Sequence, residues 1–112
     1  MVPKMREAVE YLYSSGRSPF GRWFDTLDAR PAAKVTIAVS RVEQGNIASI
    51  KSVGEGVSEI RIDWGPGYRI YFGFDGQVLI ILLAGGTKRR QDKDIADAKG
   101  NWTDYKKRKT KD

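Results

Sequence analysis

Two runs of alternating apolar and polar residues, joined by a short turn sequence, constrain the fold of this chain more than any other feature. The runs cover residues 59–64 and 68–74, and Gly65, Pro66 and Gly67 lie between them. Strict alternation is typical of strands with two different faces, and a Gly-Pro-Gly segment favours a tight connection. The sequence therefore predicts an antiparallel hairpin with one apolar face and one charged face.

The charged face of this hairpin carries two arginines and a tyrosine. Counting outward from the turn predicts the cross-strand pairs, which are Trp64 with Tyr68, Asp63 with Arg69, and Arg61 with Tyr71. A slip of one residue would move charged side chains onto the apolar face, so the face of each residue is strongly specified. We therefore expect helices to cover the apolar face and solvent to cover the charged face. On this basis Arg69→Ala should abolish function and leave folding intact.

Helix signals precede the hairpin. Ser18 followed by Pro19 is typical of a helix start, because the hydroxyl can cap free N–H groups and the fixed φ of proline suits the first turn. Gly45 is typical of a helix end. Apolar residues at helical spacing predict helices over residues 19–27 and about 28–44, both with core-facing stripes. A strand over residues 4–13 comes before them, and residues 46–56 have the composition of a connecting loop.

The segment after the hairpin predicts one buried strand and one helix. Asp75-Gly76 indicates a turn into the continuous apolar run 78–84, and helical spacing resumes from about residue 91. The expected fold is thus α+β, in the order β-α-α-β-β-β-α. A small, mainly antiparallel twisted sheet would be packed by an N-terminal helical hairpin and a C-terminal helix. We expect a single domain over residues 1–105, with a basic tail over 106–112 that is disordered alone.

The composition excludes several kinds of catalytic group. The 112 residues include no Cys and no His, so disulfides, thiolate nucleophiles and imidazole bases are excluded. The formal charge is +6, and the tail supplies five basic groups against one acid, so any anion site on the rest of the chain must come from local clusters. No apolar run is long enough to span a bilayer, and the N-terminus does not have the pattern of a signal peptide. We therefore expect a soluble cytoplasmic protein.

The strongest local cluster joins the charged hairpin face to the basic segment after the third strand. Arginine binds phosphate through a planar fork, and tyrosine can stack on a base or donate a hydrogen bond. The same residues are equally consistent with ordinary cross-strand ion pairs between the arginines and the acids Glu59 and Asp63. In a catalytic site, these two acids could instead act as bases or orient the arginines. If the cluster cleaves RNA, Tyr71 or Lys88 could move protons only with a strongly lowered pKa.

The acidic residues near position 94 do not predict a metal site. Asp92, Asp94 and Asp97 suit the first turns of a helix, where carboxylates oppose the helix dipole, and Lys93 lies among them. We therefore expect no metal and no cofactor.

Two blocks, GVSEIRIDWGPGYRIYF and LLAGGTKRRQDKDIADAK, resemble the RelE/ParE toxin superfamily, in particular its HigB-like addiction module killer proteins. The resemblance runs roughly from Arg17 to Lys99. It implies a compact toxin fold inhibited by a cognate antitoxin, commonly a helix-turn-helix protein. RelE-like members cleave mRNA in the ribosomal A site, whereas ParE-like members poison DNA gyrase.

The resemblance also assigns residues. Arg61 matches a basic catalytic position in the strand, Arg69 matches the arginine of a YR motif, and Lys88 and Arg89 match a basic pair after the last strand. Two positions differ from RelE. This chain has Glu59 at a position that is often basic in RelE, and it has Ile95 at the position of a RelE tyrosine.

We therefore predict a toxin that inhibits translation by metal-independent cleavage of mRNA, on the ribosome and without a membrane partner. The predicted catalytic residues are Arg61, Arg69, Tyr71, Lys88 and Arg89. The predicted RNA-binding residues are Lys51, Arg90, Lys106 and Lys107. Two alternatives stay open, namely a gyrase poison that acts by protein binding and a non-catalytic RNA-binding module.

Overall fold

A computed structural model describes residues 4–110 of the chain. Its elements, in chain order, are β1 (Glu7–Glu10), α1 (Pro19–Phe24), α2 (Ala29–Glu43), β2 (Ile50–Gly54), β3 (Val57–Ile62), β4 (Tyr68–Asp75), β5 (Leu79–Thr87), the 3₁₀ helix η1 (Lys88–Arg90) and α3 (Gln91–Thr110). The α+β class is confirmed, but the order gains a strand, because residues 50–54 pair with β3 and do not form a loop. No helix within residues 4–110 is both long enough and apolar enough to cross a membrane.

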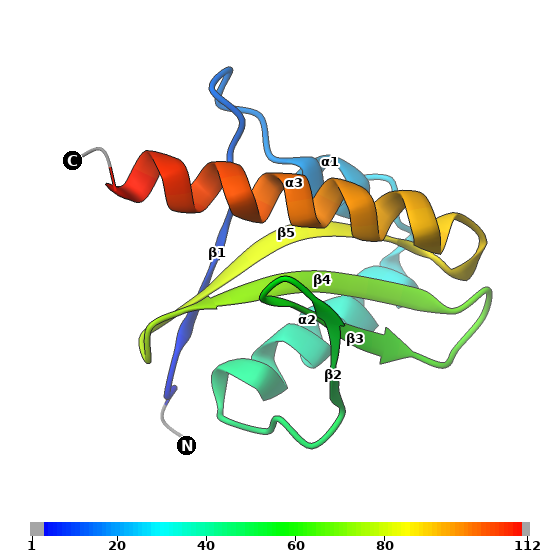
Figure 1. Cartoon of the computed structure of the whole chain (residues 1–112). Helices are drawn as coiled ribbons and strands as arrows, with labels where there is room; N and C mark the ends of the chain where they lie inside the picture. Colours follow the sequence, from blue (N-terminus) through cyan, green and yellow to red (C-terminus); the bar gives the residue numbers. More distant parts are fainter. Residues whose placement is uncertain (1–3, 111–112) are drawn as a thin grey trace.

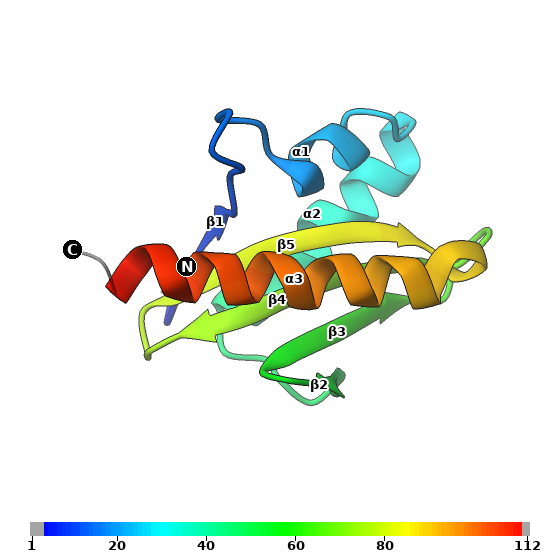
Figure 2. The same ribbon diagram turned by 45° about the horizontal axis from the view of Figure 1, so that its top comes forward.

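The five strands form one mixed sheet with the spatial order β1-β5-β4-β3-β2. β1 runs parallel to β5, and the other neighbours are antiparallel. Helices α1 and α2 lie on one face of the sheet and α3 crosses the other face (Figures 1 and 2). The central strands are therefore covered on both sides.

The face under α1 and α2 holds the first apolar core. The Ser18 hydroxyl accepts a hydrogen bond from the Gly21 N–H at 2.8 Å, and Pro19 occupies the first turn of α1, as the sequence predicts. The buried members of this core are Phe20, Val35, Val42, Ile60, Ile70, Phe72, Ile80 and Leu82. The Trp23 ring of α1 lies directly over Gly85 of β5, where a Cβ would collide with it. The predicted helical hairpin is confirmed, with α1 ending earlier than expected.

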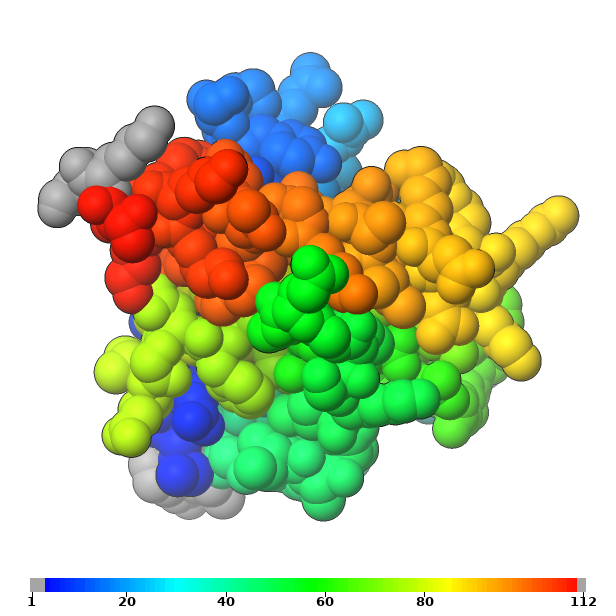
Figure 3. Space-filling view, in the orientation of Figure 1, coloured from blue at the N-terminus to red at the C-terminus, as the bar shows by residue number. Residues whose placement is uncertain are grey.

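The face under α3 holds the second core, which the sequence did not predict at this place. Its buried members are Tyr11, Val57, Tyr71, Ile81, Leu83, Ala84, Ala98 and Trp102. The Trp102 ring packs flat on β4, because Gly73 has no Cβ to hold it away. Figure 3 shows α3 lying across this face of the molecule, with the β2–β3 turn against it. The expectation of a solvent-covered charged face is therefore wrong for the part that α3 covers.

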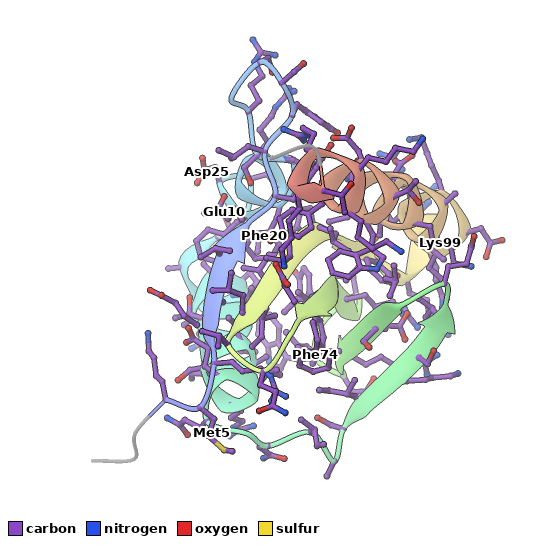
Figure 4. The ribbon with its side chains drawn as sticks, turned by 60° about the vertical axis from the view of Figure 1, so that its left-hand side comes forward. Met5, Glu10, Phe20, Asp25, Phe74 and Lys99 are labelled. Carbon is purple, nitrogen blue, oxygen red and sulfur yellow. The ribbon has the colours of Figure 1, made fainter. Side chains whose placement is uncertain are left out.

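Residues 106–110 of the basic segment that we expected to be disordered continue α3 as far as Thr110, and residues 111–112 of that segment lie outside the described residues. Tyr105 donates a hydrogen bond to Asp75 at 2.5 Å, and Tyr11 donates one to Asp104 at 2.6 Å. Nearer the other end, Lys99, labelled in Figure 4, pairs with Glu55 of the β2–β3 turn at 3.3 Å. These contacts tie α3 to three separate parts of the sheet, so charged residues at its end stay ordered.

The β3–β4 register differs from the one counted from a three-residue turn. The observed pairs include Glu59 with Tyr71, Arg61 with Arg69, and Ile62 with Tyr68. The connection therefore covers residues 63–67, closed by a hydrogen bond from the Gly67 N–H to the Trp64 carbonyl at 3.1 Å. Gly65 and Gly67 both have positive φ, which lets the longer loop close without strain. The observed pairing differs from the counted one by two residues. Because side chains alternate between the two faces, a shift of two leaves each side chain on its predicted face.

Candidate functional site

On the α3 face of the sheet, two neighbouring cross-strand rows carry polar side chains at the end where β3 stops and β4 begins. One row runs across β3, β4 and β5 through Arg61, Arg69 and Gly86. The next row runs through Glu59, Tyr71 and Ala84, and it extends outward to Lys51 on the edge strand β2. We call Glu59, Arg61, Arg69 and Tyr71 the Glu59 cluster.

A buried carboxylate lies at the centre of this cluster. Glu59 is 1% exposed, and its Oε1 accepts a hydrogen bond from Arg61 Nε at 3.0 Å. Its Oε2 is 3.6 Å from Arg69 Nε, and Gln91 of α3 donates to the same oxygen at 3.5 Å. A buried charge is costly unless it is paired, and here one carboxylate serves two guanidinium groups. Glu59 thus orients the arginines, one of the two roles that the sequence left open for it.

The two arginines differ in their access to solvent. The Arg61 side chain is 46% exposed, so its guanidinium can meet a ligand from solution. The Arg69 side chain is 7% exposed, because α3 and the neighbouring strands enclose it. Arg61 is therefore suited to direct contact with an anion, whereas Arg69 contributes positive charge from beneath.

Two buried polar atoms of the cluster have no hydrogen-bond partner within residues 4–110. They are Arg69 Nε, whose distance to Glu59 is that of an ion pair, and the Tyr71 hydroxyl. Burial raises the pKa of Tyr71, and the nearby Glu59 carboxylate raises it further. Tyr71 therefore stays protonated at neutral pH. It can donate a hydrogen bond, but it cannot act as a base.

The first turn of α3 adds a second carboxylate to this end of the sheet. The Asp94 carboxylate lies directly over Gly86, the cross-strand partner of Arg69, and a Cβ on that glycine would collide with it. Burial raises the pKa of Asp94, while the Arg90 guanidinium lowers it by a smaller amount. A carboxylate with a raised pKa is a better proton acceptor than an ordinary one, so Asp94 is a candidate base.

The basic segment after β5 lies beside the same end of the sheet. Lys88, Arg89 and Arg90 form η1 and are all exposed. The Lys88 N–H donates to the Gly67 carbonyl at 3.1 Å, so this segment is held against the β3–β4 connection. The structure thus brings the predicted basic residues next to the Glu59 cluster.

Among the predicted RNA-binding lysines, Lys51 lies beside the Glu59 cluster, whereas Lys106 and Lys107 do not. Lys51 is exposed on β2 and lies in register with Glu59, one strand outward. Lys106 lies over the Trp102 ring at 5.6 Å, and Lys107 is exposed near the far end of α3. Lys106 lies fifteen positions after Gln91 in α3, which is about 22 Å along a helix. The two distal lysines therefore belong to a different surface.

Sequence reasoning missed Gln91 and Asp94 as parts of the site. Both lie on α3, and their approach to the cluster depends on how that helix crosses the sheet. Asp63, which the counted register placed opposite Arg69, instead lies exposed in the connection, and Ile95 packs against the apolar core under α3. No group of three or more acidic side chains within residues 4–110 is arranged to hold a metal ion.

Comparison with known proteins found a matching family model and a similar protein. Residues 22–102 match the family model described as phage derived protein Gp49-like (DUF891). An uncharacterized protein of Haemophilus influenzae is 47% identical over 81 residues, which cover 71% of this chain and 82% of that protein. The matched region runs from α1 into α3 and includes the whole Glu59 cluster. The chain therefore belongs to the Gp49-like family of phage-derived proteins, within the RelE/HigB-like toxin superfamily.

Proposed function

We propose that this protein is the toxin of a type II toxin-antitoxin module and that it inhibits translation by cleaving mRNA, on the ribosome and in the cytoplasm. Members of the Gp49-like family are commonly toxins of such modules. The observation that supports cleavage best is the convergence of Arg61, Arg69 and the Lys88–Arg90 segment on one end of the sheet. The proposed partners are mRNA, the ribosome and a cognate antitoxin with a helix-turn-helix domain.

The proposed reaction is an in-line transesterification. The 2′-oxygen of a ribose attacks the adjacent phosphorus as its proton passes to a base, and the bond from phosphorus to the 5′-oxygen breaks as that oxygen gains a proton. Negative charge builds on the phosphoryl oxygens, and each well-placed cationic donor contributes about 3 kcal/mol to stabilising such charge. Arg61 would contact the phosphate directly, with Arg69 and Arg89 adding positive charge around it.

Proton transfer and hydrogen bonding to the substrate are assigned to side chains at this end of the sheet. Asp94 has a raised pKa and lies over Gly86, so it is the proposed base. Lys88, exposed and adjacent to the β3–β4 connection, is proposed to donate a hydrogen bond to the leaving oxygen, which takes its proton from water. Tyr71 would act as a neutral hydrogen-bond donor, because its pKa is raised.

Induction of the protein in cells tests this proposal. Primer extension on cellular mRNA should show discrete cuts with the wild type and none with Arg61→Ala. Arg22→Ala is a matched control, because Arg22 is an exposed arginine on α1 and forms no ion pair within residues 4–110. Intact message in cells arrested by the wild type would contradict the proposal.

The second candidate is a gyrase poison that acts by protein binding. The burial of Arg69 and Tyr71 favours it, because a poison requires no accessible catalytic group. A supercoiling assay on the same cells separates the two functions. Double-strand DNA breaks without mRNA cuts would support the poison.

A further inference from the structure

The connection between β3 and β4 holds a tryptophan that takes no part in the contacts of the Glu59 cluster. Trp64 is 36% exposed, and exposure of a single apolar side chain is ordinary by itself. Here, however, other aromatic rings hold the tryptophan ring in place, and cationic side chains lie beside it. We infer that Trp64 is a stacking platform for a base of single-stranded RNA.

A series of aromatic contacts supports the Trp64 ring from below. The Tyr68 ring stacks against it, with the ring centroids 6.3 Å apart and an interplanar angle of 25°. Tyr68 in turn contacts Trp23 of α1 at 6.4 Å, and Trp23 contacts the buried Phe20 at 5.8 Å. The series runs from the apolar core to the surface, so Trp64 is already ordered before a ligand arrives. A base that stacks on it therefore costs little side-chain entropy.

The charges beside Trp64 favour an anionic ligand. The Lys34 ammonium lies 5.0 Å from the centroid of the Trp64 ring, and Arg30 lies with both of them around a depression of about 340 Å³. Neither cation forms an ion pair within residues 4–110. Surfaces that bind single-stranded nucleic acid combine aromatic rings with cations that track the phosphates. The flexible Lys34 side chain can move from the ring to a phosphate and leave the ring to a base.

The lining of this depression indicates which feature of the base is recognised. Besides Trp64, it consists of Arg30, Ala33, Lys34 and Ile37. These side chains are cationic or apolar, so none of them accepts a hydrogen bond from the edge of a base. Stacking uses the face of the ring, which every base has. We therefore expect binding of single-stranded RNA with little sequence preference.

The main chain links Trp64 to the basic segment η1. The Gly67 N–H donates to the Trp64 carbonyl at 3.1 Å, and the Gly67 carbonyl accepts from the Lys88 N–H at 3.1 Å. The β3–β4 connection and η1 lie at the same end of the molecule (Figure 1). This step rests on the proposed function, in which Lys88 donates a hydrogen bond to the leaving oxygen. The nucleotide that carries this oxygen holds its base on the same sugar, so we assign the platform to the nucleotide on the 3′ side of the cut.

Anisotropy with two fluorescein-labelled oligomers tests the platform. One is a 2′-O-methyl hexa-adenylate, and the other is an abasic oligomer with the same number of phosphates. Wild-type protein should bind the adenylate at least about fivefold more tightly, which corresponds to about 1 kcal/mol and is the low end of what one stacked base contributes. Trp64→Ala should bind the two oligomers equally, and Trp64→Phe should keep most of the preference.

Two further variants separate stacking from charge and from aromatic exposure in general. Lys34→Gln should weaken the binding of both oligomers, and it should lower the slope of log affinity against log salt concentration by about 0.7. Tyr13→Ala is the matched control, because Tyr13 is an aromatic residue of similar exposure, 39%, in the segment after β1. It should keep the wild-type preference for the adenylate.

Three outcomes would overturn the inference. They are equal binding of both oligomers by the wild type, an unchanged preference in Trp64→Ala, or an equal loss for both oligomers in Trp64→Ala, which would make the ring a support of the fold or a contact for a protein. Circular dichroism checks that each variant is folded. Neither oligomer has the 2′-hydroxyl that cleavage requires, so the test gives an answer even if the protein cleaves no RNA. Failure of the proposed function and failure of the platform are therefore distinguishable.

Discussion

Replacing Glu59 with glutamine should destabilise the protein far more than replacing Arg61 with alanine. Glu59→Gln keeps the shape of the side chain but leaves the Arg69 guanidinium, 7% exposed, without its counter-charge. Removing one partner of a buried ion pair destabilises a protein by about 3 to 5 kcal/mol. Arg61 is 46% exposed, and an ion pair of that kind contributes about 0 to 1 kcal/mol.

Thermal unfolding followed by tryptophan fluorescence measures this difference. A domain of this size shifts its melting temperature by about 4 °C per kcal/mol, so Glu59→Gln should melt roughly 12 to 20 °C lower than the wild type. The double variant Glu59→Leu/Arg69→Met should recover most of that loss, because well-packed apolar residues can replace a buried ion pair. Equal losses for Glu59→Gln and Arg61→Ala would refute the reasoning.

Two further predictions concern α3. Gly86→Ala should destabilise the protein by about 1 to 3 kcal/mol, because the new Cβ collides with the Asp94 carboxylate of α3. Gly100→Ala places its Cβ in open space and should stabilise α3 by about 0.5 to 1 kcal/mol. Thermal melts of both variants measure these changes. The Lys109 ammonium and the Tyr105 hydroxyl hold the pKa of Asp75 below its usual 3.8, so the stability that this carboxylate contributes is present above pH 3.8 and is lost as pH falls through the lowered pKa. Urea midpoints measured down to about pH 2 should therefore fall less steeply for Asp75→Asn than for the wild type, and parallel curves would contradict the assignment.

The elements of the fold could be predicted because their signals are local. Ser18 and Pro19 start α1 through a cap that needs nothing from the rest of the chain, and Gly45 ends α2 through its positive φ. The alternation along residues 59–62 and 68–74 fixes which face each side chain takes, even though the predicted pairing was two residues out of register. Strand β2 escaped prediction because its few residues lack clear alternation and gain their hydrogen bonds from β3.

The environment of the site could not be predicted, because it depends on contacts between distant segments. Arg69 is buried because α3 crosses over it and Glu59 neutralises it, and neither fact follows from the hairpin alone. The expectation that Arg69→Ala leaves folding intact is therefore revised, since that change would leave Glu59 buried with one arginine instead of two. Asp94 reaches Gly86 through the path of α3, which no local pattern encodes.

Cleavage by purified components tests the central claim most directly. Wild-type protein and ribosomes programmed with a 5′-labelled message are mixed in a buffer with the magnesium that ribosomes require, and the new ends are mapped chemically. We predict cleavage that leaves 2′,3′-cyclic phosphate and 5′-hydroxyl ends, as attack by the 2′-oxygen requires, and at least about a hundredfold loss of rate for Arg61→Ala, since one lost donor contributes about 3 kcal/mol. An intact message, or an Arg61→Ala variant that cuts at the wild-type rate, would contradict the account.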